Sequence, residues 1–257
     1  MKKGIPEPLK DAISFLTVIP LPCPLVSKEA AGRMKQALAW FPFIGGLVGG
    51  LGGGIIFLAS SWVPASIAAL LGFLGMAVLT GGLHLDGFSD TVDGFSVPGG
   101  KEEILRVMGD SRIGAIGAIG LFILLGLKWA LIQEIPTDQS IAALVAACCL
   151  GRWAMVISAQ SFPYVPGKVG LGRLVTDSNA NGSVFFASMI GLGLVLAAVS
   201  NPGKAFLLIG LAGGALFFMN RFFVGRLGGI TGDTLGAVNE TIEVLVLLFW
   251  VAQGHAG

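Results

Sequence analysis

The chain has 257 residues, of which 54% are hydrophobic and 12% charged, with a formal net charge of +1 and a mean hydropathy of +0.84. Soluble domains carry about 25% charged residues, so this composition excludes a water-soluble globular core. No basic tract or aromatic-interleaved basic patch is present, which sets aside nucleic acid as a partner.

Residues 1–37 form a predicted cytoplasmic or interfacial N-terminal segment. Prolines and Asp11 interrupt it, so it lacks the continuous apolar core of a signal peptide. Between the prolines, Leu9, Ile13 and Leu16 recur at helical spacing. This pattern predicts a short amphipathic helix that lies on the membrane interface.

Seven apolar runs follow, each about as long as a helix that crosses roughly 30 Å of hydrocarbon. No soluble domain fits between them. The predicted fold class is all-α: a polytopic integral membrane helix bundle with about seven transmembrane helices, forming a single domain over residues 1–257. The predicted spans are 38–62, 64–83, 113–133, 138–158, 183–200, 203–220 and 235–253.

The basic residues predict the orientation of these spans. An odd number of spans puts the N-terminus and the loops 84–112, 159–182 and 221–234 on one side, and only Lys204 lies in an opposite loop. By the positive-inside rule that side is cytoplasmic and the C-terminus is outside. The basic residues on the predicted cytoplasmic side are Lys2, Lys3, Lys10, Lys28, Arg33, Lys35, Lys101, Arg106, Arg112, Lys168, Arg173, Arg221 and Arg226.

Two glycine ladders occupy the first span, Gly45, Gly49 and Gly53 in one and Gly46, Gly50 and Gly54 in the other. A small residue at every fourth position lets membrane helices approach closely. The ladders therefore predict tight helix packing or a homo-oligomer.

An acidic stripe follows the second span. If that span continues as helix, Asp86, Asp90 and Asp93 lie within about 60° of one another on one face. Repulsion among three carboxylates is relieved by a cation, and Mg²⁺ prefers carboxylate, water and phosphate oxygens. The alternative is a solvated acidic helix end, but the stripe lacks basic partners at i±4 and abuts the membrane, where ionisable groups are usually functional. His84 falls about 160° from Asp86 around the helix, so it is not expected to bind the same ion. Two alternatives remain for it: a packing or hydrogen-bonding role, or a catalytic role.

The start of the third span carries Asp110, Ser111 and Arg112. Asp110 or Ser111 fits the N-cap of the helix. A functional interpretation instead places Arg112 beside a phosphate, with the helix N-terminus aimed at the same anion. Similarly, Arg152 and Arg173 either follow the positive-inside rule or bind a polyanionic substrate.

The last span begins with a second acidic cluster. Asp233, Glu240 and Glu243 lie close to one helical face, and Glu243 falls inside the apolar run, where it needs a cavity or a cation. The glycine-rich lead-in before Thr231 is either a hinge or a loop whose amides wrap phosphate oxygens.

Five stretches together resemble the cobalamin synthase family, the adenosylcobinamide-GDP ribazoletransferases. The resemblance covers essentially the whole chain, and the block that starts at His84 is its most specific part. One departure is Gly109, where a lysine is expected before the Asp-Ser pair. The stretches are Phe15–Pro22, Phe41–Gly46, His84–Gly94, Asp110–Gly114 and Thr231–Ala237.

The resemblance implies a Mg²⁺-dependent enzyme of the inner membrane, with its active site on the cytoplasmic side. It would join α-ribazole, or its 5′-phosphate, to adenosylcobinamide-GDP and release GMP. The ribazole hydroxyl would attack the phosphorus on the corrinoid arm, with carboxylates holding the metal or accepting the proton. The predicted metal ligands are Asp86, Asp90, Asp93, Asp233, Glu240 and Glu243; the predicted catalytic residues are Asp93, Asp110, Asp233 and Glu240; the predicted substrate-binding residues are His84, Ser111, Arg112, Arg152, Arg173 and Thr231.

Three rivals share parts of this pattern. The CDP-alcohol phosphotransferases and the aromatic prenyltransferases also use aspartate-rich motifs. A cation transporter is the rival from another class, with Glu243 as its best argument. Transporters place their acids near the membrane midplane, whereas most acids here lie at the cytoplasmic ends of the predicted spans.

Overall fold

The computed structural model describes residues 5–21, 28–168, 170–176 and 180–255, and within these ranges it contains helices and no strands. Lys2 and Lys3 of the predicted cytoplasmic side lie outside the described residues. The helices are α1 (Glu7–Leu16), α2 (Lys28–Ala37), η1 (Leu38–Trp40), α3 (Phe41–Ala59), α4 (Ala65–Thr80), α5 (Leu83–Ser96), α6 (Lys101–Val107), α7 (Ala115–Glu134), η2 (Thr137–Gln139), α8 (Ser140–Ser161), α9 (Leu171–Thr176), α10 (Asn181–Ala198), α11 (Pro202–Leu227) and α12 (Gly232–His255).

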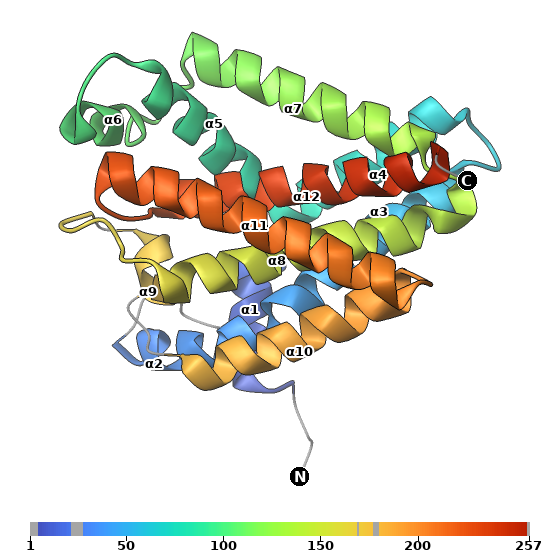
Figure 1. The fold of residues 1–257 in the computed structure, drawn as a ribbon, viewed down its shortest axis with the longest axis horizontal. Coiled ribbons are helices and arrows are strands. Elements are labelled where there is room, and N and C mark those ends of the chain that lie inside the picture. Colours follow the sequence, from blue (N-terminus) through green and yellow to red (C-terminus); the bar gives the residue numbers. More distant parts are fainter. Residues whose placement is uncertain (1–4, 22–27, 169, 177–179, 256–257) are drawn as a thin grey trace.

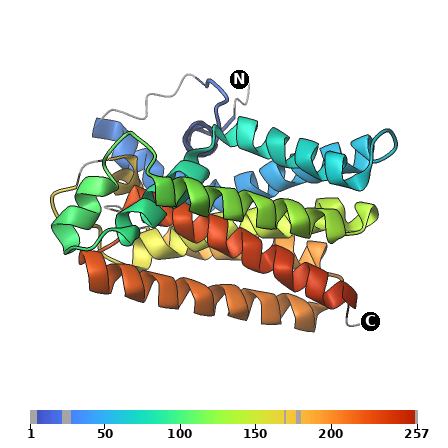
Figure 2. The ribbon, with the colours of Figure 1, turned by 90° about the horizontal axis from the view of Figure 1, so that it is seen from above.

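The long helices run side by side and form one bundle around α8 (Figures 1 and 2). Most of α8 is buried, and α3 and α12 pack against it most extensively. The short helices α2, α6 and α9 lie at one end of the bundle, and the C-terminus lies at the other (Figure 1). The loops predicted to share one side of the membrane therefore gather at one end of the molecule.

The predicted helical membrane fold is confirmed, and the count of about seven spans is approximate. Five helices among the described residues are long and apolar enough to cross a membrane, or six if α4 and α5 together make one bent span. Gly182–Ala198 is a shorter apolar helix. Several boundaries also differ, because α11 continues to Leu227 and α12 begins at Gly232.

The chain bends sharply between α4 and α5. The segment of the acidic stripe is helical, as supposed from the sequence, but α5 does not continue α4 in a straight line: the two helices are bent by 89°. Gly81 and Gly82 have φ angles of 62° and 69°, a left-handed conformation that glycine adopts without steric cost. The bend redirects the acidic stripe across the bundle, where α5 packs on α12 and α7.

The predicted N-terminal helix is confirmed as α1. Leu16 is fully buried, and Leu9 and Ile13 pack against the core. Buried Asp11 forms an ion pair with Arg33 at 3.0 Å, which ties α1 to α2. This helix therefore docks on the bundle through its apolar face.

The first glycine ladder packs α3 against α8. A Cβ on Gly45, Gly49 or Gly53 would overlap backbone atoms of α8, at Cys148, Leu144 and Ile141 respectively. In the second ladder, a Cβ on Gly54 would meet nothing within 4 Å. The close packing predicted from these glycines is thus confirmed within the chain, while self-association stays a prediction.

Gly49→Ala is expected to destabilise the protein by about 1–3 kcal/mol or more, because the new methyl group would force α3 away from α8. Gly54→Ala is the matched control, and higher helix propensity predicts no loss of stability there. Unfolding of both variants in detergent, followed by circular dichroism, tests this. Equal stability of the two variants would show that α3 and α8 are not in backbone contact.

Candidate functional site

Two cavities adjoin at the bend between α4 and α5. The larger is a groove of about 840 Å³ that brings Asp86 and Asp90 together with Asp110 and Ser111. The smaller is a pocket of about 220 Å³, whose polar lining residues are His84, Asp86, Tyr164, Lys168 and Asp233. Asp86 borders both cavities, so the motifs from three distant stretches of sequence converge on one site.

The wall of the site depends on a close approach of α5 to α12. A Cβ on Gly87 would lie 3.0 Å from the Asp233 carbonyl oxygen, and one on Gly236 would lie 3.0 Å from the His84 carbonyl oxygen. Because both positions are glycine, the acidic stripe of α5 lies against the start of α12. Asp90 is half-buried there and is repelled by Asp86 and Asp233.

Lys168 is the cation nearest to these acids. Its Nζ lies 2.8 Å from the Asp233 carboxylate, and both side chains are partly exposed. The two cavities are therefore bordered by one lysine and by four carboxylates, those of Asp86, Asp90, Asp110 and Asp233. Ser89, which lines the groove, is buried and its hydroxyl has no hydrogen-bond partner among the described residues.

Asp93 also lies on α5, but its carboxylate binds the N-terminal end of α7. Its carboxylate accepts hydrogen bonds from the backbone N–H groups of Gly114 and Gly117, at 2.7 Å each. A carboxylate at this position also complements the positive end of the α7 dipole. The negative charge at the N-terminus of α7 is therefore the carboxylate of Asp93, a residue of the same chain.

The N-cap predicted at Asp110 or Ser111 is wrong, because α7 begins at Ala115 after Gly114. Asp110 instead accepts hydrogen bonds from the Arg112 backbone N–H at 3.0 Å and from the Arg112 guanidinium at 2.8 and 3.1 Å. These bonds lower the pKa of Asp110 to about 2. Ser111 lines the groove, and the side chains of Ser111 and Arg112 are both exposed.

The glycine-rich lead-in to α12 forms a turn. Gly228 has a φ of 73° at the end of α11, and the Ile230 N–H donates to the Pro163 carbonyl at 2.8 Å. Thr231 is buried and caps α12: its hydroxyl accepts from the Thr234 N–H at 3.2 Å, and the Thr234 hydroxyl accepts from the Thr231 N–H at 2.8 Å. The amides of Ile230 and Thr231 are thus paired within the chain, and the hinge and the phosphate-binding loop both stay predictions.

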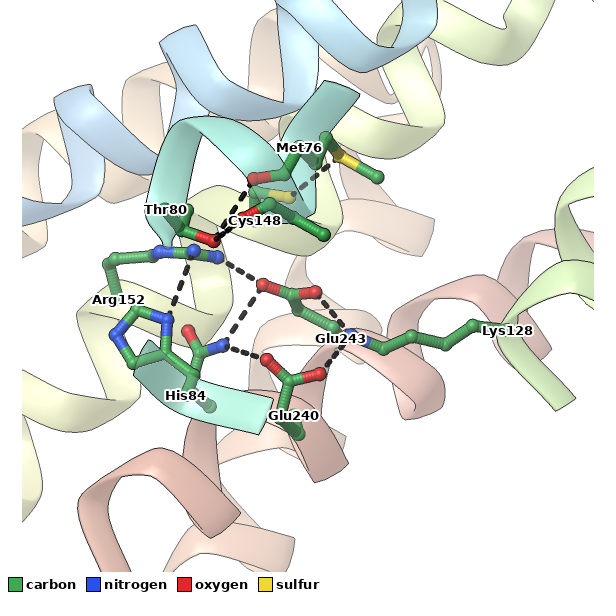
Figure 3. Close-up of polar contacts among 10 residues, drawn as sticks. Met76, Thr80, His84, Lys128, Cys148, Arg152, Glu240 and Glu243 are labelled. Atoms are coloured by element: carbon green, nitrogen blue, oxygen red, sulfur yellow. Dashed lines mark hydrogen bonds and ion pairs between the residues drawn. The ribbon is translucent and has the colours of Figure 1, made fainter. Parts of the chain in front are cut away.

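A buried ionic network fills the interior beside the site (Figure 3). Lys128 of α7 pairs with Glu240 and, at 2.6 Å, with Glu243 of α12. Arg152 of α8 pairs with Glu243 and lies 3.2 Å from Nδ1 of His84. The amide of Asn239 donates to both glutamates at 3.1 Å. We define these residues, namely Lys128, Arg152, Asn239, Glu240 and Glu243, as the buried network.

The buried network gives each of the two intramembrane acids a cationic partner. Lys128, Arg152, Glu240 and Glu243 are at most 6% exposed. Among the described residues, no group of three or more His, Cys, Asp and Glu side chains is positioned to hold a metal ion. The predicted metal set is thus divided: Asp86, Asp90 and Asp233 border the cavities, Asp93 caps α7, and Glu240 and Glu243 lie in the network. Their roles as metal ligands stay predictions.

Sequence reasoning missed Lys128 as a partner of the glutamates. The available signal was a lysine within an apolar run, which is costly unless paired. Because Glu240 and Glu243 are acids within another apolar span, the need to neutralise buried charge indicated that Lys128 pairs with them. Arg173, a predicted substrate-binding residue, lies exposed on α9 at the same end of the bundle as α6.

The chain is similar to known proteins over nearly its whole length. The family described as cobalamin-5-phosphate synthase matches residues 8–251. A protein of Desulforamulus reducens named adenosylcobinamide-GDP ribazoletransferase is 36% identical over 244 residues, covering 93% of this chain and 94% of the relative. Proteins with the same name from Klebsiella pneumoniae strain 342 and Roseiflexus sp. are 35% and 38% identical, covering 92% and 93% of this chain and 96% and 87% of the relatives. No solved structure matches the chain.

Glu240→Gln is expected to destabilise the protein by about 3–5 kcal/mol, because it leaves an excess buried positive charge on Lys128. Adding Lys128→Met should recover a large part of that loss, since it restores charge balance. A double-mutant cycle of unfolding in detergent measures the coupling.

The matched control is the exposed pair of Glu103 and Arg106. Glu103→Gln is expected to leave stability close to that of the wild type, because exposed ion pairs are screened by water. Additive effects of Glu240→Gln and Lys128→Met would contradict the proposed dependence of the bundle on the buried network.

Proposed function

The chain belongs to the cobalamin-5-phosphate synthase family, and on that premise we propose that it transfers α-ribazole, or its 5′-phosphate, onto adenosylcobinamide-GDP with release of GMP. The observation that carries this proposal is the similarity to proteins named adenosylcobinamide-GDP ribazoletransferase, which extends over more than 90% of this chain and of each of two relatives. The groove supports it independently. Its carboxylates, together with Lys168 of the adjoining pocket and Arg112 beside Asp110, suit a metal-bound diphosphate more than a neutral substrate.

We further propose that Asp86 and Asp90 hold Mg²⁺ together with oxygens of the substrate. The residues fit this ion, because oxygen ligands surround a shared cavity and their mutual repulsion is relieved by a cation. Mg²⁺ commonly takes only one or two protein carboxylates and completes its shell with water and phosphate. It would supply neutralisation of the charge that develops on the transferred phosphoryl group.

Asp233 is the best-placed carboxylate to orient the attacking hydroxyl. It borders the smaller pocket at the start of α12, next to α5, and its carboxylate pairs with Lys168. Of the other predicted catalytic acids, Asp93 accepts two backbone hydrogen bonds and Glu240 pairs with Lys128. Asp110 is a weak base because its pKa is about 2. Asp233 therefore receives the ribazole hydroxyl, and Lys168 faces the phosphate.

We propose that the groove opens to the cytoplasm from the inner membrane. The support is the concentration of basic residues in the loops that gather at the groove's end of the bundle. Water-soluble, highly charged substrates reach such a site without crossing the bilayer.

Purified protein in nanodiscs, supplied with adenosylcobinamide-GDP, α-ribazole and Mg²⁺, is expected to release GMP in proportion to corrinoid product. Chelation of Mg²⁺ should stop the release and added Mg²⁺ should restore it. Chromatography of nucleotides measures both. A folded protein that releases no GMP under these conditions would overturn the proposed function.

Asp90→Asn is expected to lower kcat at least about 100-fold by removing a metal ligand, with the thermal unfolding of the protein retained. Glu102→Gln, an exposed acid on α6, is the control and should keep wild-type turnover. A raised Mg²⁺ requirement of the Asp90 variant supports the metal role, whereas near-normal kcat at limiting Mg²⁺ contradicts it.

A further inference from the structure

His84 joins the buried network to the substrate pocket, and its two ring nitrogens have different surroundings. Nδ1 lies 3.2 Å from the Arg152 guanidinium. Nε2 is buried and has no hydrogen-bond partner among the described residues. Figure 3 shows this second nitrogen on the side of the ring away from the network, and His84 lines the smaller pocket with Asp86, Lys168 and Asp233.

Arg152 determines where the imidazole carries its proton. A guanidinium has only donors, so Nδ1 must be the acceptor of this hydrogen bond. In a neutral imidazole the proton then resides on Nε2. Arg152 is itself fixed by Glu243, and Glu243 by Lys128. Three helices thus hold one tautomer of a residue on a fourth.

A buried N–H without a partner is costly, so the protonated Nε2 calls for an acceptor. Within the pocket the fixed acidic groups are Asp86 and Asp233, while Lys168 adds positive charge. A diphosphate supplies acceptor oxygens there. Resting on the proposed function, we propose that His84 donates a hydrogen bond from Nε2 to a phosphoryl oxygen of the diphosphate substrate, and that Arg152 is the positioning residue that fixes this tautomer.

A neutral imidazole in this role keeps its proton throughout the transfer. It stabilises charge on the phosphoryl oxygen as a preorganised donor, without acting as an acid. This role also explains why the buried network, which otherwise holds helices together, contacts His84, a side chain that lines the pocket. The buried cations contribute to the site through His84 and do not contact the substrate themselves.

The chain is suited to a direct test because it contains two histidines, His84 and His255. His255→Gln leaves His84 as the single source of imidazole signals in protein labelled with ¹⁵N-histidine. In nanodiscs, its ¹⁵N spectrum is expected to show a protonated Nε2 and an unprotonated Nδ1. Inorganic pyrophosphate with Mg²⁺ should shift the Nε2 resonance. Any other protonation pattern, or an Nε2 signal that pyrophosphate leaves unchanged, overturns the proposal.

Two substitutions at His84 separate its nitrogens. Glutamine places an amide donor near the Nε2 position, whereas asparagine reaches only the Nδ1 position. His84→Gln is expected to retain kcat/KM within about tenfold, and His84→Asn to lose about 100-fold or more. Equal activities, or a better asparagine variant, contradict donation from Nε2.

The role of Arg152 has its own readout. In Arg152→Met the ¹⁵N spectrum should contain both neutral tautomers, and Arg152→Lys, which keeps a donor, should preserve the wild-type pattern. A single Nε2-protonated form in folded Arg152→Met overturns the positioning role; if that variant does not fold, loss of the wild-type pattern in Arg152→Lys does so. Because the spectra require no turnover, failure of GMP release with an intact pyrophosphate shift removes the proposed function alone.

Discussion

The ion pairing of Lys128 and Arg152 with Glu240 and Glu243 is the constraint on which the bundle depends. In an apolar interior each of these charges is costly, and the cost is offset only if the partners meet in good geometry. They come from α7, α8 and α12, so satisfying the charges fixes the relative position of three helices. The arrangement is balanced, with two cations and two anions, and the Asn239 amide uses further acceptor positions. Through Arg152 the same constraint extends to α5 and hence to the site.

Glycine supplies the second requirement, since the network can close only if the backbones approach. A Cβ on Gly151 would lie 2.6 Å from the Asn239 side-chain oxygen, so α8 and α12 meet where the network forms. Gly87 and Gly236 play the same part between α5 and α12. Tight contact and buried charge thus support each other: small residues bring the helices together, and the ion pairs give that contact a single register.

The features that follow from local sequence were predictable. The apolar runs predicted most of the long helices, and the spacing of Leu9, Ile13 and Leu16 predicted α1. The motif stretches contain most of the residues that border the cavities. Features set by distant partners were not. Asp93 shares a helix with Asp86 and Asp90, yet its role depends on amides more than twenty residues away. The left-handed turn at Gly81 and Gly82 was not predicted, because glycine permits this conformation without requiring it, and the bend also depends on what α5 packs against.

The acids of this chain show why residue type alone does not assign a role. In the sequence, Glu243 is the best argument for a cation transporter, because an acid in an apolar run needs a cavity or a cation. The structure gives it two resident cations instead, Lys128 and Arg152, so its burial needs no transported ion. By contrast, Asp86 and Asp90 border a cavity and have no ion pair among the described residues. The acids that remain open to a ligand are therefore those at the bend, where the redirected α5 meets the start of α12, and this is where the proposed substrate would meet both carboxylates and the His84 donor.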